Sequence, residues 1–317
     1  MNLTQTNENK KNKKNEKKSS NFLPFFCMGL FLVSVQILSI ILAQPMIDEG
    51  MQFSDNPKNV WLSVYYIGMI LIFTLVILIA MKRNMKWLIH GFILFSVAVT
   101  LYYVFYAIFA IYLEEFTNIV LSSVLCLFLT IAMYKFPEWY VIDLIGILIG
   151  AGVTALFGIS FGILPALILL ILLAIYDAVS VYQTKHMLTL AEGVMDMKVP
   201  ILFIIPNNLK FSYRDYKYNS QKEREAFFMG LGDAIMPTIL VVSANVFITE
   251  AYMQIPLIGA LNIPALGAAV GTVIGFAVLM ILVARGKPQA GLPFLNTGAV
   301  LGYVIGCLSV GVSIIPL

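Results

Sequence analysis

Two aspartates of this chain lie inside apolar runs, where a carboxylate is costly. Asp177 lies in the run 164–182, and Asp233 lies in the next one, 227–248. An ionisable residue inside a membrane span indicates a functional site, because burying a charge in hydrocarbon costs free energy. Two such carboxylates placed together cannot comfortably carry two negative charges. One can then act as a base on a water molecule while the other, protonated, acts as an acid on a carbonyl group.

A third acidic residue, Asp143, also falls within an apolar run, but close to its start. It lies beside Trp139 and Tyr140, and aromatic residues of this kind are typical of the membrane–water interface. We therefore expect Asp143 to reach water or a lipid headgroup and to have a structural role.

The composition predicts a membrane protein with many spans. Of the 317 residues, 60% are hydrophobic and only 12% are charged, against about 25% charged in soluble domains. The low charge argues against a nucleic-acid-binding protein. The three cysteines, Cys27, Cys126 and Cys307, lack metal-ligand spacing, so we expect neither a metal nor another cofactor.

Nine runs are long enough to cross a bilayer, which takes about 20 apolar residues. The sequence therefore predicts an all-α membrane protein with nine transmembrane helices, at 22–44, 60–81, 87–113, 117–134, 139–158, 162–183, 226–248, 263–284 and 292–316. Loops rich in Lys and Arg alternate with loops that are not, and basic loops favour the cytoplasm. This alternation predicts a cytoplasmic N-terminus.

The charge pattern also divides the chain. We expect a disordered, basic cytoplasmic tail at 1–21, six transmembrane helices in 22–183, a cytoplasmic loop at 184–225 and three helices in 226–317. Within the loop, the apolar stretch 200–206 is bounded by prolines, which leaves a strand or a re-entrant segment open.

The loop boundaries predict the depth of the two aspartates. Asp177 precedes Lys185 by eight residues, and Asp233 follows Glu225 by eight. At 1.5 Å per helical residue, each lies about 12 Å inside the cytoplasmic boundary. Two neighbouring antiparallel helices would then hold both carboxylates at one depth. That the side chains face each other is a hypothesis.

The pair alone leaves a hydrolase and a transporter open, because transporters also keep buried acids. Its neighbours favour the hydrolase. Gly230 and Gly232 precede Asp233, and small residues let another backbone approach closely. Tyr176 adds a phenol next to Asp177.

These residues carry a resemblance to a known family. Tyr176-Asp177 on one span and Gly230-Leu231-Gly232-Asp233 on the next resemble the paired YD and GxGD motifs of presenilins and signal peptide peptidases. The predicted topology is similar to presenilin, and the chain as a whole is similar to archaeal presenilin homologues. The resemblance implies a GxGD-type intramembrane aspartic endopeptidase in an archaeal cell membrane, with Asp177 and Asp233 as its catalytic dyad.

The family's third motif, Pro-Ala-Leu-Pro before the ninth helix, is altered here. Ala290-Gly291-Leu292-Pro293 resembles it, with Ala for the first Pro and Gly for the central Ala. The resemblance implies that this segment docks substrate. An irregular segment is tolerated at membrane depth where it lines a cavity, and its free backbone groups could pair with an unwound substrate. Two unaltered matches, at 165–167 and 264–266, lie in other spans and are interpreted as chance.

The sequence thus predicts an enzyme that hydrolyses peptide bonds within transmembrane segments or remnant signal peptides, with the lipid bilayer as its other partner. We expect no obligate subunits, and a homo-oligomer stays open. The alternative is an ion channel or proton-coupled transporter that uses the same aspartates. The chain has no His-Glu-x-x-His metalloprotease motif. The G-x-S-x-G match at 158–162 lacks the strand that should precede it.

Overall fold

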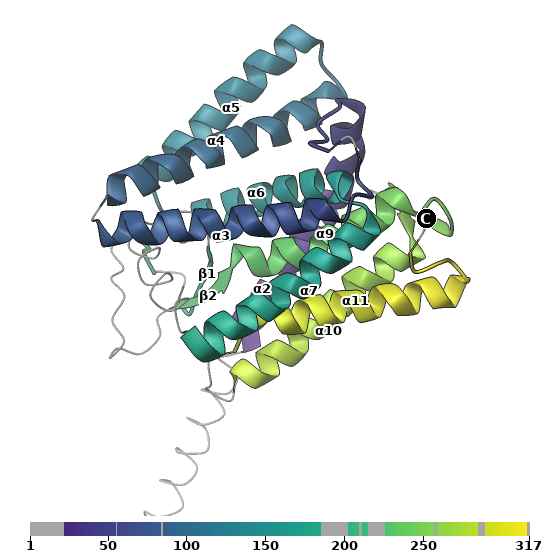
Figure 1. Ribbon diagram of the computed structural model, residues 1–317. Helices are drawn as coiled ribbons and strands as arrows, with labels where there is room; N and C mark the ends of the chain where they lie inside the picture. Colours follow the sequence, from purple (N-terminus) through teal and green to yellow (C-terminus); the bar gives the residue numbers. More distant parts are fainter. Residues whose placement is uncertain are drawn as a thin grey trace, which may run out of the picture.

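Nine α-helices account for most of the described part of the chain (Figure 1). The computed structural model describes residues 22–54, 56–83, 85–184, 202–208, 211–214, 226–256, 259–284 and 289–315. The helices are α2 (Phe22–Asp48), α3 (Trp61–Lys82), α4 (Lys86–Ala110), α5 (Glu115–Lys135), α6 (Trp139–Ser160), α7 (Ile163–Val179), α9 (Leu231–Phe247), α10 (Ile263–Val283) and α11 (Gly291–Val310). The predicted tail 1–21 and most of the predicted loop 184–225 lie outside the described residues.

Eight of these helices are long and apolar enough to cross a membrane, and α9, with 17 residues, is a shorter apolar helix. This confirms the predicted all-α, multi-pass membrane fold. The cytoplasmic position of the N-terminus stays a prediction.

Helix α6 lies at the centre of the bundle, against α2, α4 and α9. In its most apolar window 67% of the residues are buried, whereas the corresponding figure for α3 is 6%. Since α3 is nevertheless apolar all round, its exposed side chains are suited to lipid rather than water. Figure 1 shows α4 and α5 on one side of this centre, and α10 and α11 side by side on the other.

Glycines bring α10 and α11 into backbone contact. A Cβ on Gly271 would overlap the carbonyl oxygen of Gly298, and a Cβ on Gly302 would overlap that of Gly267. Glycine is needed at such positions because any side chain would separate the two backbones. This contact fixes α11, whose first residues carry the Pro-Ala-Leu-like segment, against α10.

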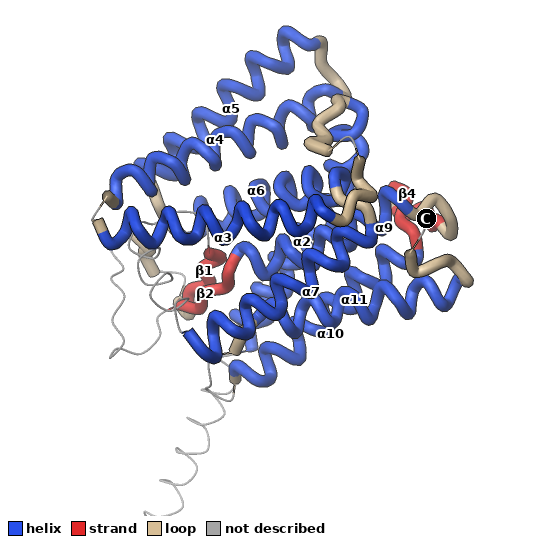
Figure 2. Tube along the Cα trace, in the orientation of Figure 1, coloured by secondary structure: helices blue, strands red, loops and turns tan. Residues whose placement is uncertain are grey.

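The predicted seventh span, 226–248, is wrong in its first five residues. These form strand β2 (Ala226–Gly230), which pairs antiparallel with β1 (Leu202–Pro206), and the helix begins only at Leu231. Pairing with β1 satisfies the backbone of this stretch without a helix, and Gly230 keeps an extended conformation at the junction. The stretch left open at 200–206 is therefore a strand over Leu202–Pro206 (Figure 2).

Two other helix ends differ from the prediction. The sixth helix gives way after Val179 to a π-helical turn, η1 (Ser180–Thr184), and such turns are frequent at functional sites. The ninth ends at Val310, where Gly311 adopts a left-handed conformation with φ 70°. A second hairpin, β3 (Tyr252–Ile255) and β4 (Gly259–Asn262), precedes α10. Figure 2 shows β4 at the end of the bundle opposite β1–β2.

Candidate active site

The two aspartates come from helices that meet at the end of the bundle where β1 and β2 lie. Asp177 is close to the C-terminal end of α7, and Asp233 is in the first turn of α9. Helices α7, α9 and α11 contact one another. The chain therefore brings two distant carboxylates to the beginning of α11.

Asp177 is buried, with 5% of its surface exposed. Its Oδ2 accepts a hydrogen bond of 3.1 Å from the backbone N–H of Leu292, and the N–H of Gly291 lies near the same carboxylate. These N–H groups belong to the first turn of α11 and have no partner within that helix. Asp177 thus caps α11 from a neighbouring helix.

Asp233 lies beside the same segment. A Cβ on Gly291 would be 2.9 Å from Asp233 Oδ1 and 3.0 Å from Oδ2, so only a glycine leaves the carboxylate where it is. Asp233 is partly exposed, and it is close enough to Asp177 for the two charges to interact. Both carboxylates therefore converge on Gly291 and Leu292.

The Pro-Ala-Leu-like segment differs in form from the irregular segment that we expected. Ala290 is the buried N-cap residue of α11, and the helix begins at Gly291. The segment is helical because Asp177 satisfies an N–H group that would otherwise be unpaired. The segment lies beside both aspartates.

The other predicted site residues are placed as follows. Leu231 is buried and packs on Gly150 of α6, whose added Cβ would be 3.1 Å from Leu231 Cδ1. Gly230 lies beside Asp233, with 3.4 Å between its added Cβ and Asp233 Oδ2, whereas Gly232 faces open space. Tyr176 is partly buried. Among the described contacts, none joins Tyr176 to either carboxylate.

A second link ties η1 to the segment before α11. The Tyr182 hydroxyl donates a 2.8 Å hydrogen bond to Oε1 of Gln289, two residues before Gly291. We did not predict this link, since neither residue type carries a motif signal.

One further polar residue near this site was also missed. Asn296, one turn after Leu292, is buried, and its Nδ2 donates to the carbonyl of Leu170 in α7 at 2.9 Å. An asparagine four residues after Leu292 on an apolar helix would have been the sequence signal, because positions i and i+4 share a helix face.

The expectation that Asp143 reaches water or a headgroup is wrong. Only 3% of its surface is exposed, and its Oδ1 accepts a 2.8 Å hydrogen bond from the N–H of Ile204 in β1. The strand covers this end of α6, and its edge N–H group requires an acceptor. Its other oxygen, Oδ2, is also buried and has no hydrogen-bond partner among the described groups.

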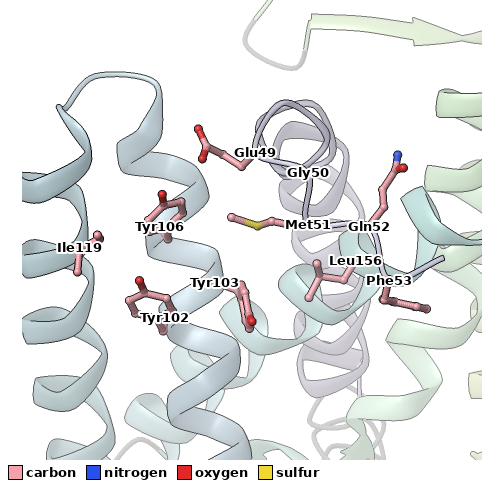
Figure 3. Close-up of a pocket in the computed structure, with 10 residues that line it drawn as sticks. All are labelled: Glu49, Gly50, Met51, Gln52, Phe53, Tyr102, Tyr103, Tyr106, Ile119 and Leu156. Atoms are coloured by element: carbon pink, nitrogen blue, oxygen red, sulfur yellow. The ribbon is translucent and has the colours of Figure 1, made fainter. Parts of the chain in front are cut away.

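A cavity of about 640 Å³ lies away from the two aspartates, among the ends of α2, α4, α5 and α6. Figure 3 shows its lining, with Tyr102, Tyr103 and Tyr106 on α4 and Glu49 just after α2. None of the predicted site residues lines it. Among the described residues, no group of three His, Cys, Asp or Glu side chains could hold a metal ion.

The fold brings two carboxylates together within a bundle of apolar helices, and comparison with known proteins gives the family of the chain. The family model described as "Signal-peptide peptidase, presenilin aspartyl protease" matches residues 28–312. The chain therefore belongs to this family, as the motifs indicated, and it is a multi-pass intramembrane aspartic endopeptidase.

Solved structures agree. A presenilin family intramembrane aspartate protease in a C222 crystal form is 39% identical, with a TM-score of 0.69, over 90% of this chain and 99% of that one. A structure described in the same words, in a P2 crystal form, is 40% identical, with a TM-score of 0.68, over 91% and 99%. No curated protein matches the chain at a significant level.

Proposed function

We propose that Asp177 and Asp233 are the catalytic dyad of this protease. The observation that carries the proposal is their convergence on Gly291 and Leu292, one through a hydrogen bond and the other through close packing. Two carboxylates at one point inside a bundle of apolar helices match the requirement of aspartic-protease chemistry for a shared proton.

The proposed reaction begins with a water molecule between the two side chains. The ionised carboxylate takes a proton from this water as its oxygen attacks the peptide carbonyl carbon, and the protonated carboxyl gives its proton to the carbonyl oxygen. The resulting gem-diol collapses when its C–N bond breaks: the carboxyl that took the water proton gives it to the amide nitrogen, and the other, now ionised, takes a proton from a gem-diol hydroxyl as the C=O bond re-forms. Both carboxyl groups then return to their starting states, so no metal or cofactor is required.

We propose that the substrate is a transmembrane helix or a remnant signal peptide, unwound near the cleaved bond. Helical peptide bonds are shielded by their own hydrogen bonds and side chains. The β1–β2 hairpin supports this proposal, because an extended segment can add to the edge of a sheet. Strand β2 leads directly through Gly230 to Asp233. A substrate strand along β2 would therefore bring its backbone to the dyad.

We also propose that the dyad lies toward the cytoplasmic side of an archaeal cell membrane and that the enzyme acts without obligate subunits. No described feature favours the channel or transporter alternative over proteolysis.

The test is cleavage of a model transmembrane peptide by the purified full-length chain in liposomes, followed by product masses. Asp177→Asn and Asp233→Asn should each abolish product while the protein stays folded. Full activity in either variant would show that the two aspartates are not the catalytic dyad. An ion-flux assay on the same liposomes checks the alternative, and flux that depends on the aspartates in the absence of proteolysis would favour it.

A further inference from the structure

Asp143 is not part of the proposed dyad, but it contacts β1, which pairs with β2, the strand that leads to Asp233. Its Oδ1 accepts from the N–H of Ile204 at 2.8 Å, across 61 positions of the sequence. Ile204 is the middle residue of β1 and is opposite Phe228 in β2. In an antiparallel pair, a residue whose N–H points to the outer edge makes no ladder bond with its opposite residue. Asp143 therefore occupies the edge of β1 that faces away from β2.

A second carboxylate holds the same region. Glu138, which precedes α6, accepts from the Ser212 hydroxyl at 2.9 Å and from the backbone N–H of Tyr213 at 3.2 Å. The ring of Tyr213 is buried in a small cluster with Ile142 of α6, Ile204 of β1 and Ala226 of β2. The beginning of α6 thus contacts both β1 and the turn at Ser212 and Tyr213.

Gly146 adds a packing contact one turn further along α6. A Cβ there would be 3.2 Å from Cε1 of Phe203, so the glycine lets the aromatic ring lie against the helix. Phe203 is fully buried and also packs against Phe31 of α2, with ring centroids 5.2 Å apart. Strand β1 is therefore fixed along its length by α6 and α2, and Asp143 provides the polar contact at its centre.

The position of β1 affects the dyad because β1 pairs with β2, the strand that leads to Asp233. β1 sets the register of β2, Gly230 ends β2, and Asp233 follows in the first turn of α9. Strand residues rise about 3.3 Å each, so a slip of one residue would move β2 by that amount and turn its side chains to the opposite face. A contact that holds β1 in place therefore opposes such a slip of β2, and with it a shift of any substrate strand paired with the hairpin.

A purely structural role explains Asp143 poorly. Its second oxygen is buried and accepts nothing among the described groups, and such a group costs free energy that an apolar side chain would not. A strand edge is, however, commonly closed by a helix that covers it, and Asp143 lies on α6, the helix that covers the outer edge of β1.

We infer that Asp143 is a positioning residue that selects the cleaved bond. It closes the outer edge of β1 and fixes the hairpin register, so that substrate strands add on the β2 side and present one bond to the dyad. This inference rests on the proposed function, because it assumes that substrate pairs with the hairpin.

The test measures which bonds are cut, as well as how fast. The purified full-length protein in liposomes is given one model transmembrane peptide, and the product masses report the share of each cleavage site. Asp143→Leu removes the acceptor and should redistribute cleavage, lowering the preference for the main bond about tenfold or more, as expected when the buried N–H of Ile204 is left without an acceptor. Asp143→Asn keeps an acceptor oxygen and should keep the preference for cleavage at the main bond. Thr154→Val is the matched control, since Thr154 is a buried polar residue of α6 whose hydroxyl has no partner among the described groups.

A complementary variant removes the other half of the contact. Ile204→Pro deletes the N–H donor, and proline is tolerated where the N–H lies at a strand edge. It should produce the same redistribution as Asp143→Leu, and it carries the test alone should that variant fail to fold. Amide exchange at β1 should be faster in both.

Unchanged product masses in folded Asp143→Leu and Ile204→Pro would overturn the inference. So would an Asp143→Asn variant that behaves like Asp143→Leu, because the effect would then come from the charge rather than from the contact. Asp177→Asn and Asp233→Asn in the same assay keep the two proposals apart. If these two variants remain active, the proposed dyad is wrong. If they are inactive and the product masses of Asp143→Leu and Ile204→Pro equal those of the unaltered protein, only the role of Asp143 is wrong.

Discussion

Gly291 lies so close to the Asp233 carboxylate that a Cβ on Gly291 would be 2.9 Å from Oδ1. The position belongs to the Pro-Ala-Leu-like segment, whose central residue is Ala in the family motif. The substitution of Gly for Ala therefore has a local consequence in this chain, since it sets how near Asp233 can approach the beginning of α11.

Replacing this glycine should move the carboxylate. We expect Gly291→Ala to rotate Asp233 away from Gly291 and to lower kcat by about tenfold or more, because sub-ångström changes in geometry reduce rates strongly. Steady-state cleavage of a model transmembrane peptide measures this. Gly91→Ala on α4 is the control, as its added Cβ meets nothing within 4 Å. A Gly291→Ala enzyme with normal kcat would show that the carboxylate adjusts without loss.

The two functions of Asp177 should separate by substitution. It caps α11 through the N–H group of Leu292, and loss of a helix cap costs about 0.5–2 kcal/mol. Asp177→Ala should therefore lower the free energy of unfolding by about that amount, whereas Asp177→Asn, which keeps an acceptor, should lose less. Both should be inactive. Thermal unfolding in detergent gives the comparison, and equal stability of the two variants would argue against the cap.

The contact between Gly271 and Gly298 should be intolerant of any side chain. Gly271→Ala places a methyl group against the carbonyl oxygen of Gly298, and overpacking of this kind costs about 1–3 kcal/mol. We expect a lower unfolding temperature and, because α11 moves, lower activity. Gly68→Ala on α3 has open space at its added Cβ and provides the matched control. A Gly271→Ala protein as stable as Gly68→Ala would contradict the close packing.

The hydrogen bond from Tyr182 to Gln289 should affect activity more than stability. Both side chains are at least partly exposed, so we expect Tyr182→Phe to change the free energy of unfolding by less than about 1 kcal/mol. Because the bond ties η1 to the segment before Gly291, kcat should fall by about threefold to tenfold. Tyr112→Phe, at a tyrosine that is 80% exposed, is the control. Identical kcat values for both variants would remove any role for the bond.

The sequence predicted most of the helices and indicated the two aspartates that the fold brings to Gly291, because long apolar runs and isolated acids are local signals. The strand over 226–230 could not be predicted in this way. Its five residues are apolar and continuous with the following helix, and a short apolar run does not distinguish strand from helix by period.

Asp143 shows the other limit of the sequence. Its neighbours Trp139 and Tyr140 correctly place it near the end of a span, but its partner Ile204 is 61 positions away. No local pattern indicates that a strand from a distant loop will cover that end of α6. The sequence therefore predicted an aqueous surrounding where the fold provides a backbone N–H group.

The glycine contact between α10 and α11 has a mechanical consequence. Side chains between helices can change rotamer and let the helices slide, but two backbones in direct contact leave nothing to rearrange. Together α10 and α11 form a rod that is stiffer than either helix alone, and Gly291 and Leu292 are at its tip. The end of α11 that lies against both aspartates is thus a fixed reference point for the positioning of a substrate.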